Sequence, residues 1–167
     1  FPDGSRVEAL VPPVAPDGPH VAIRRFFKET LTVERLVKFG ALPELAAECL
    51  EAFVASKLNV LIAGGTGSGK TSLLNALSQF IPSRDRVVVL EESKEVRVAC
   101  PHAIYLEARA PNVEGQPGIS IRQLFRATLR LRPDRIVIGE LRGEEALDIV
   151  QAMVSGHGGC LGTVHAT

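Results

Sequence analysis

Short apolar runs alternate along the chain with longer segments in which apolar residues recur every three or four positions. The short runs are typical of strands buried on both faces, and they cover residues 59–63, 86–90, 103–109, 135–140 and 160–165. The segments with helical spacing are 33–39, 43–57, 71–82, 120–132 and 144–155. This alternation of strands and helices predicts an α/β fold with a mostly parallel sheet.

The N-terminal part has a different pattern. Turn-forming residues dominate positions 1–20, and two strand candidates lie at 6–11 and 20–27. Two strands of this length do not make a stable unit alone. We therefore expect residues 1–28 to be the tail of another domain and its linker, residues 29–167 to form the main domain, and the chain to be a fragment.

Local signals also mark the ends and faces of helices. Thr30 and Thr32 are alternative caps for the helix at 33–39, and Ser120 with Gln123 has the spacing of a capping box. In the helix at 43–57 one buried face is expected; its residues are Leu45, Ala46, Cys49, Leu50, Phe53 and Val54. On that face Cys49 is expected to be a small core residue.

Composition sets broader limits. Nineteen basic residues balance nineteen acidic ones, so no large net field attracts the chain to nucleic acid or to an anionic membrane. The three cysteines are far apart and odd in number, which is typical of reduced thiols in a cytosolic protein. No apolar run has the length of a bilayer span. We expect a cytoplasmic protein without a transmembrane segment and without direct nucleic-acid binding.

The glycine-rich segment 64–71 carries the clearest chemistry, because it fits the P-loop pattern G-x-x-x-x-G-K-[ST] between a strand and a helix. Glycines allow successive N–H groups to point inward and bind phosphate, and the helix adds its positive N-terminal end. Lys70 is expected to reach the β- and γ-phosphates of a nucleoside triphosphate, and Thr71 to ligate Mg²⁺. The expected nucleotide-binding residues are Gly64, Gly65, Thr66, Gly67, Ser68, Gly69, Lys70, Thr71 and Ser72.

Carboxylates follow two of the predicted strands. The strand at 86–90 leads to Glu91 and Glu92, and the strand at 135–140 ends at Glu140. Ligands of open α/β sheets bind at these carboxyl ends. The helix after residue 120 has a basic stripe in which Arg126 and Arg130 are explained by a solvated face, whereas Arg122 lies in the first turn beside a loop.

Three further motifs resemble those of the secretion ATPase superfamily, which drives type II and type IV secretion and pilus assembly. Residues 131–142 (LRPDRIVIGELR) resemble its Walker B box, 156–166 (GHGGCLGTVHA) its histidine box, and 89–93 (VLEES) its acidic box. An N-K-x-D or T-K-x-D guanine-reading element is missing, which counts against a GTPase. Segments 2–7, 23–26 and 107–115 resemble most the tight-adherence (Flp) pilus ATPases, the CpaF-like branch, with conjugation-type ATPases close behind.

The resemblance implies an architecture. Members have a smaller N-terminal α+β domain and a RecA-like motor domain, and six subunits form a ring. ATP then lies between the two lobes and against the next subunit. The resemblance also implies inner-membrane platform proteins of a secretion or pilus machine as partners, and a location on the inner face of the cytoplasmic membrane.

The resemblance further implies catalytic roles. Glu91 matches the water-polarising base, and Glu140 matches the residue that holds Mg²⁺ through water. Arg109 and Arg122 match arginines that approach the γ-phosphate. The histidine box, which senses the γ-phosphate, corresponds to His157 and His165. The segment at Arg24 and Arg25 is expected near the base and ribose.

Alternatives stay open at several of these positions. Glu92 stands where the family has Asp, and its extra methylene displaces the carboxylate, which favours Glu91 as the base. Glu91 as an ordinary strand-end carboxylate and Arg109 as a surface residue are the simpler explanations. His157, Cys160 and His165 as zinc ligands have irregular spacing and no fourth ligand nearby.

Two other functions compete with the motor. A nucleotide-gated scaffold would bind ATP and assemble but scarcely hydrolyse it; the two glutamates favour the motor. A small-molecule kinase would share the P-loop, but the histidine box and the lack of an obvious arginine-rich lid count against it.

Overall fold

The computed structural model describes residues 5–25, 31–111, 116–143, 145–154 and 156–166. Several sequence predictions therefore lie outside the described residues. They concern the turn at 2–4, the end of the second strand at Phe26 and Phe27, the cap Thr30, the domain boundary near residue 28, the loop at 112–115, and the helix ends at 144 and 155.

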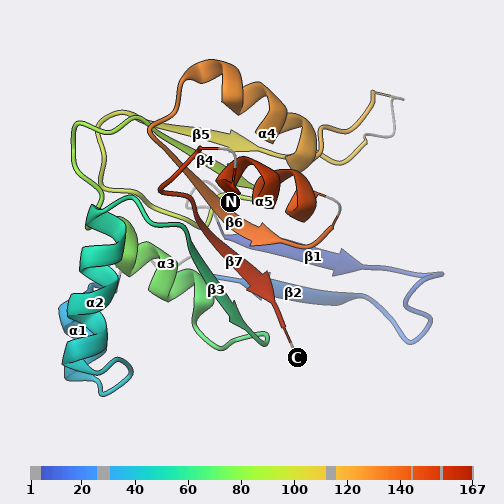
Figure 1. Ribbon diagram of the computed structural model, residues 1–167. Helices are drawn as coiled ribbons and strands as arrows, with labels where there is room; N and C mark the ends of the chain where they lie inside the picture. The colour runs from blue at the N-terminus through green and yellow to red at the C-terminus, as the bar shows by residue number, and fades with distance from the viewer. Residues whose placement is uncertain (1–4, 26–30, 112–115, 144, 155, 167) are drawn as a thin grey trace.

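A five-stranded sheet forms the centre of the molecule (Figure 1). All neighbouring strands pair in parallel, in the order β3-β7-β6-β4-β5. The strands are β3 (Val60–Gly64), β4 (Val87–Glu91), β5 (Ala103–Glu107), β6 (Arg135–Leu141) and β7 (Leu161–His165). The predicted α/β fold with a mostly parallel sheet is confirmed, and each predicted strand lies within two residues of its observed bounds.

Helices cover both faces of this sheet, and the first four side chains of β4 show why that part of the strand is apolar. Val87 and Val89 pack in the core cluster under α1 (Val33–Lys38), α2 (Glu44–Ala55) and α3 (Lys70–Ser78). Val88 and Leu90 point to the opposite face and pack under α4 (Ile121–Thr128) and α5 (Glu145–Val154) (Figure 1). A strand covered on both faces reads as a continuous hydrophobic run.

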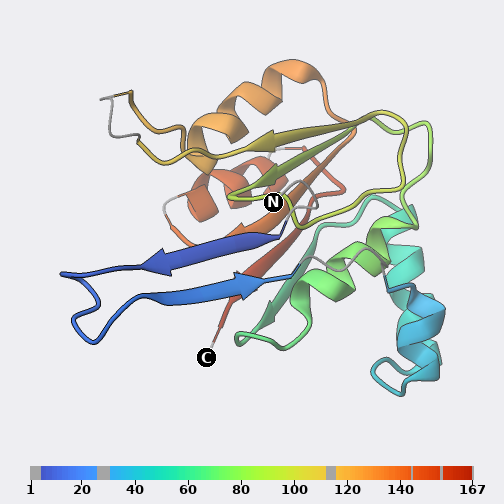
Figure 2. The ribbon, with the colours of Figure 1, turned by 180° about the vertical axis from the view of Figure 1, so that it is seen from behind.

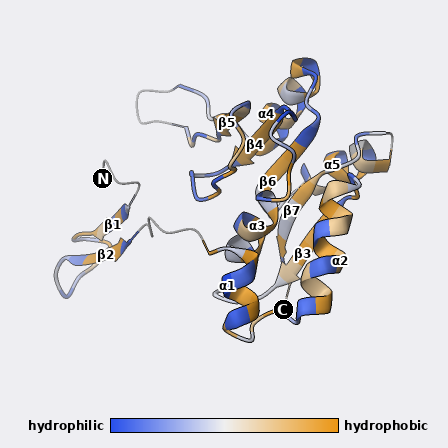
Figure 3. Ribbon diagram, turned by 90° about the vertical axis from the view of Figure 1, so that its left-hand side faces the viewer, coloured by the Kyte–Doolittle hydropathy of each residue, from blue (hydrophilic) through white to orange (hydrophobic). Residues whose placement is uncertain are grey.

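The N-terminal strands form a separate two-stranded sheet. β1 (Arg6–Leu10) pairs antiparallel with β2 (His20–Arg24), and every residue of both strands is exposed. Figure 2 shows this hairpin from behind, and Figure 3 shows that it stands apart from the five-stranded sheet and its helices. The hairpin therefore buries little surface of its own in the described part of the chain.

The helix ends follow the predicted signals. The Thr32 side chain accepts from Arg35 N at 3.3 Å and caps α1. Ser120 and Gln123 form the complete capping box at the start of α4, which continues as a 3₁₀ turn over Leu129–Leu131. None of the helices in the described ranges is both long and apolar enough to cross a membrane.

The predicted buried face of α2 is wrong in part. Cys49 is exposed rather than a core residue, Leu45 is 72% exposed and Phe53 is 44% exposed. The helix instead buries Ala47 and Val54, with Leu50 packed against the same cluster. The apolar stripe in the sequence is wider than the buried face, because α2 contacts α1 and α3 with only part of that stripe and leaves Leu45 and Phe53 exposed.

A buried ion pair lies at the amino ends of the strands, the end of the sheet that is farther from the P-loop. Arg135, the first residue of β6, is 1% exposed, and its Nε donates to Asp85 Oδ2 at 2.7 Å. Its Nη1 donates to the carbonyl of Val54, at the end of α2, at 2.5 Å. The guanidinium therefore joins a strand, the turn before β4 and a helix in a region sealed from water.

Candidate nucleotide site

The P-loop leads from the carboxyl end of β3 into α3. Gly67 and Gly69 have φ angles of 73° and 89°, in the left-handed region where a side chain is strained. Gly69 is the N-cap residue, and α3 begins at Lys70. The glycines therefore let the backbone turn so that the N-terminal end of α3 faces the loop, which is the geometry that binds phosphate.

Lys70 already lies over this loop. Its Nζ donates to the carbonyl of Gly65 at 2.7 Å, and the Ser68 hydroxyl donates to the same carbonyl at 2.9 Å. An ammonium group held by a carbonyl oxygen keeps its charge free to interact with an anion on its other side. The lysine is therefore positioned for phosphate without a large rearrangement.

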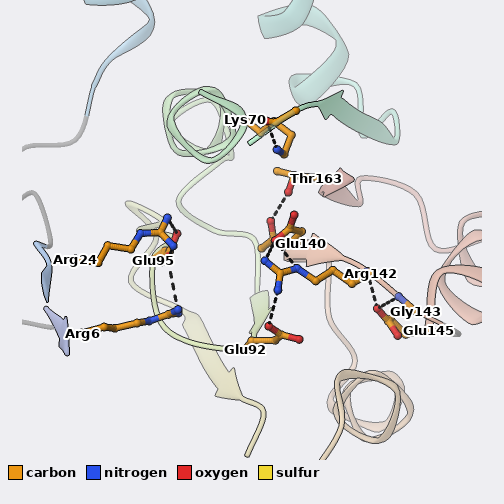
Figure 4. A network of polar contacts seen from close by, with 12 residues as sticks. Arg6, Arg24, Lys70, Glu92, Glu95, Glu140, Arg142, Gly143, Glu145 and Thr163 are labelled. Carbon is orange, nitrogen blue, oxygen red and sulfur yellow. Dashed lines mark hydrogen bonds and ion pairs between the residues drawn. The ribbon is translucent and has the colours of Figure 1, made fainter. Parts of the chain in front are cut away.

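A cavity of about 350 Å³ opens between the P-loop and the carboxyl ends of β4 and β6. The P-loop side is lined by residues 66–72, and the strand ends contribute glutamates, serine, glycine and threonine. Three arginines complete the lining, and they come from β1, β2 and the end of β6 (Figure 4). The residues outside the P-loop are Arg6, Arg24, Glu91, Glu92, Ser93, Glu95, Gly139, Glu140, Arg142 and Thr163.

Glu91 ends β4 inside the protein and is 4% exposed. Its Oε1 accepts from the backbone N of Glu95 at 2.9 Å and of Val96 at 2.8 Å. Burial raises the pKa of Glu91 to about 7. The hydrogen bonds from the two backbone amides oppose this shift, and the negative charges of Glu95 and Glu107 add to it. A carboxyl group that titrates near neutral pH suits a general base.

Gly139 of β6 makes room for that carboxyl group. A Cβ on Gly139 would lie 2.9 Å from Glu91 Cγ and 3.1 Å from its Oε1. The carbonyl of Gly139 accepts from the Thr163 hydroxyl of β7 at 2.5 Å (Figure 4). Any larger residue here would displace Glu91, so the glycine before Glu140 has a packing reason.

Glu140 and Glu92 lie on the open side of the same cavity. Arg142 Nε donates to Glu140 Oε2 at 2.7 Å, and its Nη1 donates to Glu92 Oε2 at 3.3 Å (Figure 4). The side chain of Glu92 is 60% exposed, whereas that of Glu140 is 26% exposed. The two consecutive glutamates therefore differ: Glu91 is buried and held, and Glu92 is largely in solvent.

The oxygen ligands that Mg²⁺ prefers are present in this cavity. Thr71 lies in the first turn of α3 and Glu140 near the end of β6, and both line the cavity. Within the described ranges no cluster of three or more His, Cys, Asp and Glu side chains forms a cage for a metal. The residues thus fit an ion that takes most of its ligands from phosphate and water, as Mg²⁺ does in nucleotide sites.

The two histidines of the predicted histidine box lie at different ends of β7. His165 ends the strand and lines a neighbouring cavity with Thr66 and Glu140. His157 precedes the strand. It therefore lies near the amino ends of the parallel strands, whereas the P-loop lies at their carboxyl ends. The Nδ1 of His157 is buried, and none of the described residues forms a hydrogen bond with it. Only His165 is therefore brought to the nucleotide side.

The predicted arginines are also placed differently. Arg109 forms an isolated antiparallel bridge with Ile119, and its Nη2 donates to the carbonyl of Pro117 at 3.4 Å. Arg122 makes an ion pair with Asp148 of α5. Neither is among the described residues that line the cavity. Arg24 is among them, whereas Arg25 is exposed just after β2.

Sequence reasoning gave no site role to three charged residues of this cavity: Arg6, Arg142 and Glu95. Arg142 follows Glu140 by two residues and was within reach of the motif analysis. Glu95 lies just after the 89–93 box and Arg6 lies in the 2–7 segment, and their proximity depends on where the hairpin sits against the segment after β4 (Figure 4). A single sequence carries no signal for that contact.

The comparisons with known proteins decide the family. The model of the family described as "Type II/IV secretion system protein" matches residues 1–167. This chain belongs to the type II/IV secretion system protein family. The RecA-like α/β core predicted from the resemblance is therefore confirmed, and the family is that of the type II/IV secretion ATPases.

Individual relatives agree with this family assignment. A putative conjugal transfer protein of Mycobacterium tuberculosis is 42% identical over 161 residues, which is 96% of this chain and 46% of the relative. The chain therefore spans about half the length of this curated relative. The crystal structure of the VirB11 ATPase from the Brucella suis type IV secretion system, in complex with sulphate, is similar with a TM-score of 0.62 and 30% identity. That match covers 99% of this chain and 54% of the other.

A further solved structure supports the fold alone. The pilus retraction motor PilT with bound ADP has a TM-score of 0.64 at 19% identity, with 99% of this chain and 49% of that chain covered. These matches do not single out the tight-adherence pilus branch, and they include conjugal transfer proteins. The branch therefore remains a prediction.

Proposed function

We propose that the chain is the nucleotide-binding part of a motor that hydrolyses ATP to drive a type II or type IV secretion machine or the assembly of a Flp pilus. The observation that carries the proposal is one cavity with three features. It joins a P-loop to a buried carboxyl group, Glu91, and to a second carboxylate, Glu140, on the neighbouring strand. A scaffold or a phosphate-binding module would not need a base buried at its phosphate site.

The residues of this cavity divide the work of hydrolysis. Lys70, the P-loop amides and the arginines that line the cavity bind and neutralise the phosphates. Thr71 and Glu140 would hold Mg²⁺, and the ion would supply charge stabilisation at the phosphates when bound. Glu91 accepts a proton from the attacking water, whose oxygen bonds to the γ-phosphorus while the bond to the ADP oxygen breaks.

The remaining predicted roles belong to the assembled protein. We propose a hexameric ring in which residues 1–28 end a smaller N-terminal domain and residues 29–167 begin the motor domain. Arg109, Arg122 and His157 are then assigned to contacts across subunits or to later conformations, since they do not line the cavity of one subunit. The proposed partners are inner-membrane platform proteins, and the proposed location is the cytoplasmic face of that membrane.

The alternative within the family is a DNA-transfer motor. The name of the Mycobacterium tuberculosis relative, a putative conjugal transfer protein, favours it, whereas the segments near Arg24 and Arg109 favour the pilus branch. The neighbouring genes distinguish the two: pilin and prepilin peptidase genes indicate a pilus, and relaxase genes indicate conjugation.

The first prediction tests nucleotide binding. Lys70→Ala in the full-length protein should weaken Mg·ATP binding about tenfold or more, because a charge-assisted contact to phosphate contributes roughly 1.5–3 kcal/mol. Titration with a fluorescent nucleotide measures the change. The matched control is Lys38→Ala at the end of α1, which should bind like the wild type. Unchanged affinity in Lys70→Ala would remove the P-loop assignment.

The second prediction concerns pH. Because burial raises the pKa of Glu91 to about 7, most of this carboxyl group is protonated below that pH and cannot accept a proton. We expect kcat/KM of the full-length protein to rise from about pH 6 to about pH 8 and then level off, as the base ionises. Phosphate release measured across this range gives the profile. A flat profile would contradict Glu91 as the base.

A steady-state phosphate-release assay also decides between the motor and the nucleotide-gated scaffold. The motor turns over ATP continuously, and the scaffold releases at most one phosphate per bound nucleotide. The assay uses the full-length protein, with Lys70→Ala as the background control.

A further inference from the structure

Glu95 is a carboxylate outside the sequence motifs that contacts the N-terminal hairpin and the nucleotide site at once. Arg6 Nη2 lies 3.5 Å and Arg24 Nη1 3.2 Å from its Oε1, and Arg24 Nη2 donates to its Oε2 at 3.4 Å. Arg6 and Arg24 are directly opposite each other in the β1–β2 register. One arginine from each strand of the hairpin therefore converges on a single carboxylate (Figure 4).

The backbone of the same residue holds the proposed base. Glu95 N and Val96 N both donate to Oε1 of Glu91, at 2.9 and 2.8 Å. Glu91 is buried, so these hydrogen bonds from backbone amides form away from water and determine where its carboxyl group points. Any movement of Glu95 toward or away from the hairpin therefore moves the two donors that position Glu91.

The other side of this segment is anchored to the P-loop helix. Asn75 of α3 donates through Nδ2 to the carbonyl of Glu95 at 3.4 Å, and its Oδ1 accepts from Arg97 N at 2.8 Å. The backbone around Glu95 is thus held by the core, and its side chain is held by the hairpin. Glu95 is therefore the residue at which contacts from the hairpin and contacts from the core of the five-stranded sheet meet.

We propose that Glu95 is a positioning residue through which the N-terminal hairpin controls the placement of Glu91. The inference rests on the proposed function, because it needs Glu91 to be the base. Two guanidinium groups face one carboxylate, so the contact leaves positive charge directed into the cavity. Since Arg6 and Arg24 line that cavity with Lys70, a bound polyphosphate competes with Glu95 for them. The presence of a bound nucleotide and the position of the hairpin thereby both affect the placement of the Glu91 carboxyl group.

The first test separates positioning from binding. Glu95→Gln in the full-length protein keeps the backbone N–H but removes the charge that attracts the arginines. We expect kcat to fall on the order of tenfold while ATP affinity is not weakened, because a misplaced base acts on the transition state and not on binding. Glu48→Gln, an exposed carboxylate of α2, is the matched control and should keep the wild-type kcat.

A double-mutant cycle with Arg24→Gln shows whether hairpin and base are coupled. If Glu95 acts through Arg24, the double variant should lose about as much kcat as the more affected single variant. The coupling would be overturned if the factor by which kcat falls in the double variant were the product of the factors in the two single variants. It would also be overturned if ATP affinity fell as much as kcat in Glu95→Gln, which would indicate a general structural role.

The second test needs neither ATP nor turnover. Hydrogen–deuterium exchange of the full-length protein should become at least severalfold faster at the amides of Glu95 and Val96 in Glu95→Gln and in Arg24→Gln, while β6 exchanges as in the wild type. Wild-type exchange in both variants overturns the coupling even if the protein hydrolyses ATP. Faster exchange in a protein that binds but does not hydrolyse ATP supports the coupling and refutes the proposed function.

Discussion

Replacing Glu91 by Gln in the full-length protein is expected to lower kcat on the order of a hundredfold or more, with near-normal ATP affinity. The amide keeps the shape of the side chain and its hydrogen bonds with Glu95 N and Val96 N, but it does not accept a proton. A base acts mainly in the transition state, and its contribution is typically of this size. Steady-state phosphate release and nucleotide titration measure the two quantities separately.

Two other glutamates of the cavity provide comparisons for this result, one as a matched control and one with a different expected loss. Glu92→Gln should keep most of the turnover, because its side chain is 60% exposed and pairs with Arg142 in solvent. Glu140→Gln should lose turnover as well, and its remaining activity should depend more steeply on Mg²⁺ concentration, because a ligand of the ion is altered. Normal turnover in Glu91→Gln together with inactive Glu92→Gln would show that Glu92 is the base.

Replacing Asp85 by Ala is expected to destabilise the fold around the five-stranded sheet by about 3–5 kcal/mol, the usual cost of leaving one partner of a buried ion pair alone. Arg135 is the largest side chain that is fully buried in the described part of the chain. Without Asp85 its charge keeps only the carbonyl of Val54 as a described hydrogen-bond partner. Urea unfolding of the full-length protein, followed at the transition of the part that contains the five-stranded sheet, measures the loss.

A second variant separates the pair from the loss of a side chain. Asp85→Ala combined with Arg135→Met removes the uncompensated charge and should recover part of the free energy of unfolding. Glu48→Ala, at an exposed position of α2, should change stability by no more than about 0.5 kcal/mol. A change of that small size in Asp85→Ala would contradict the buried pair as a major stabilising contact.

Local features of this protein were fixed by sequence. The P-loop needs glycines at positions with positive φ, and Gly67 and Gly69 have such angles. The cap of α1 at Thr32 and the capping box of α4 likewise depend on residues within one turn of each other. The apolar run at 87–90 predicted a buried strand, because these four residues of β4 are covered on both faces and none of them is polar.

The position of Glu91 and Glu140 on neighbouring strands followed only partly from the sequence. Each carboxylate lies at or next to the end of an apolar run, so the edge of the sheet could be predicted. The strand order could not, because it depends on how each crossover helix packs, and β7 inserts between the P-loop strand β3 and β6. That insertion places Thr163 against Gly139.

Tertiary structure alone decided which charges meet. Arg6 and Arg24 reach Glu95 because the hairpin packs its arginines toward the segment after β4, and Arg135 meets Asp85 fifty residues away in the core. Exposure of Cys49 was decided in the same way, by the narrow contact of α2 with its neighbours. Sequence patterns record each residue's own periodicity and near neighbours. Contacts between distant segments depend on the free energy of packing whole elements together, which no local pattern contains.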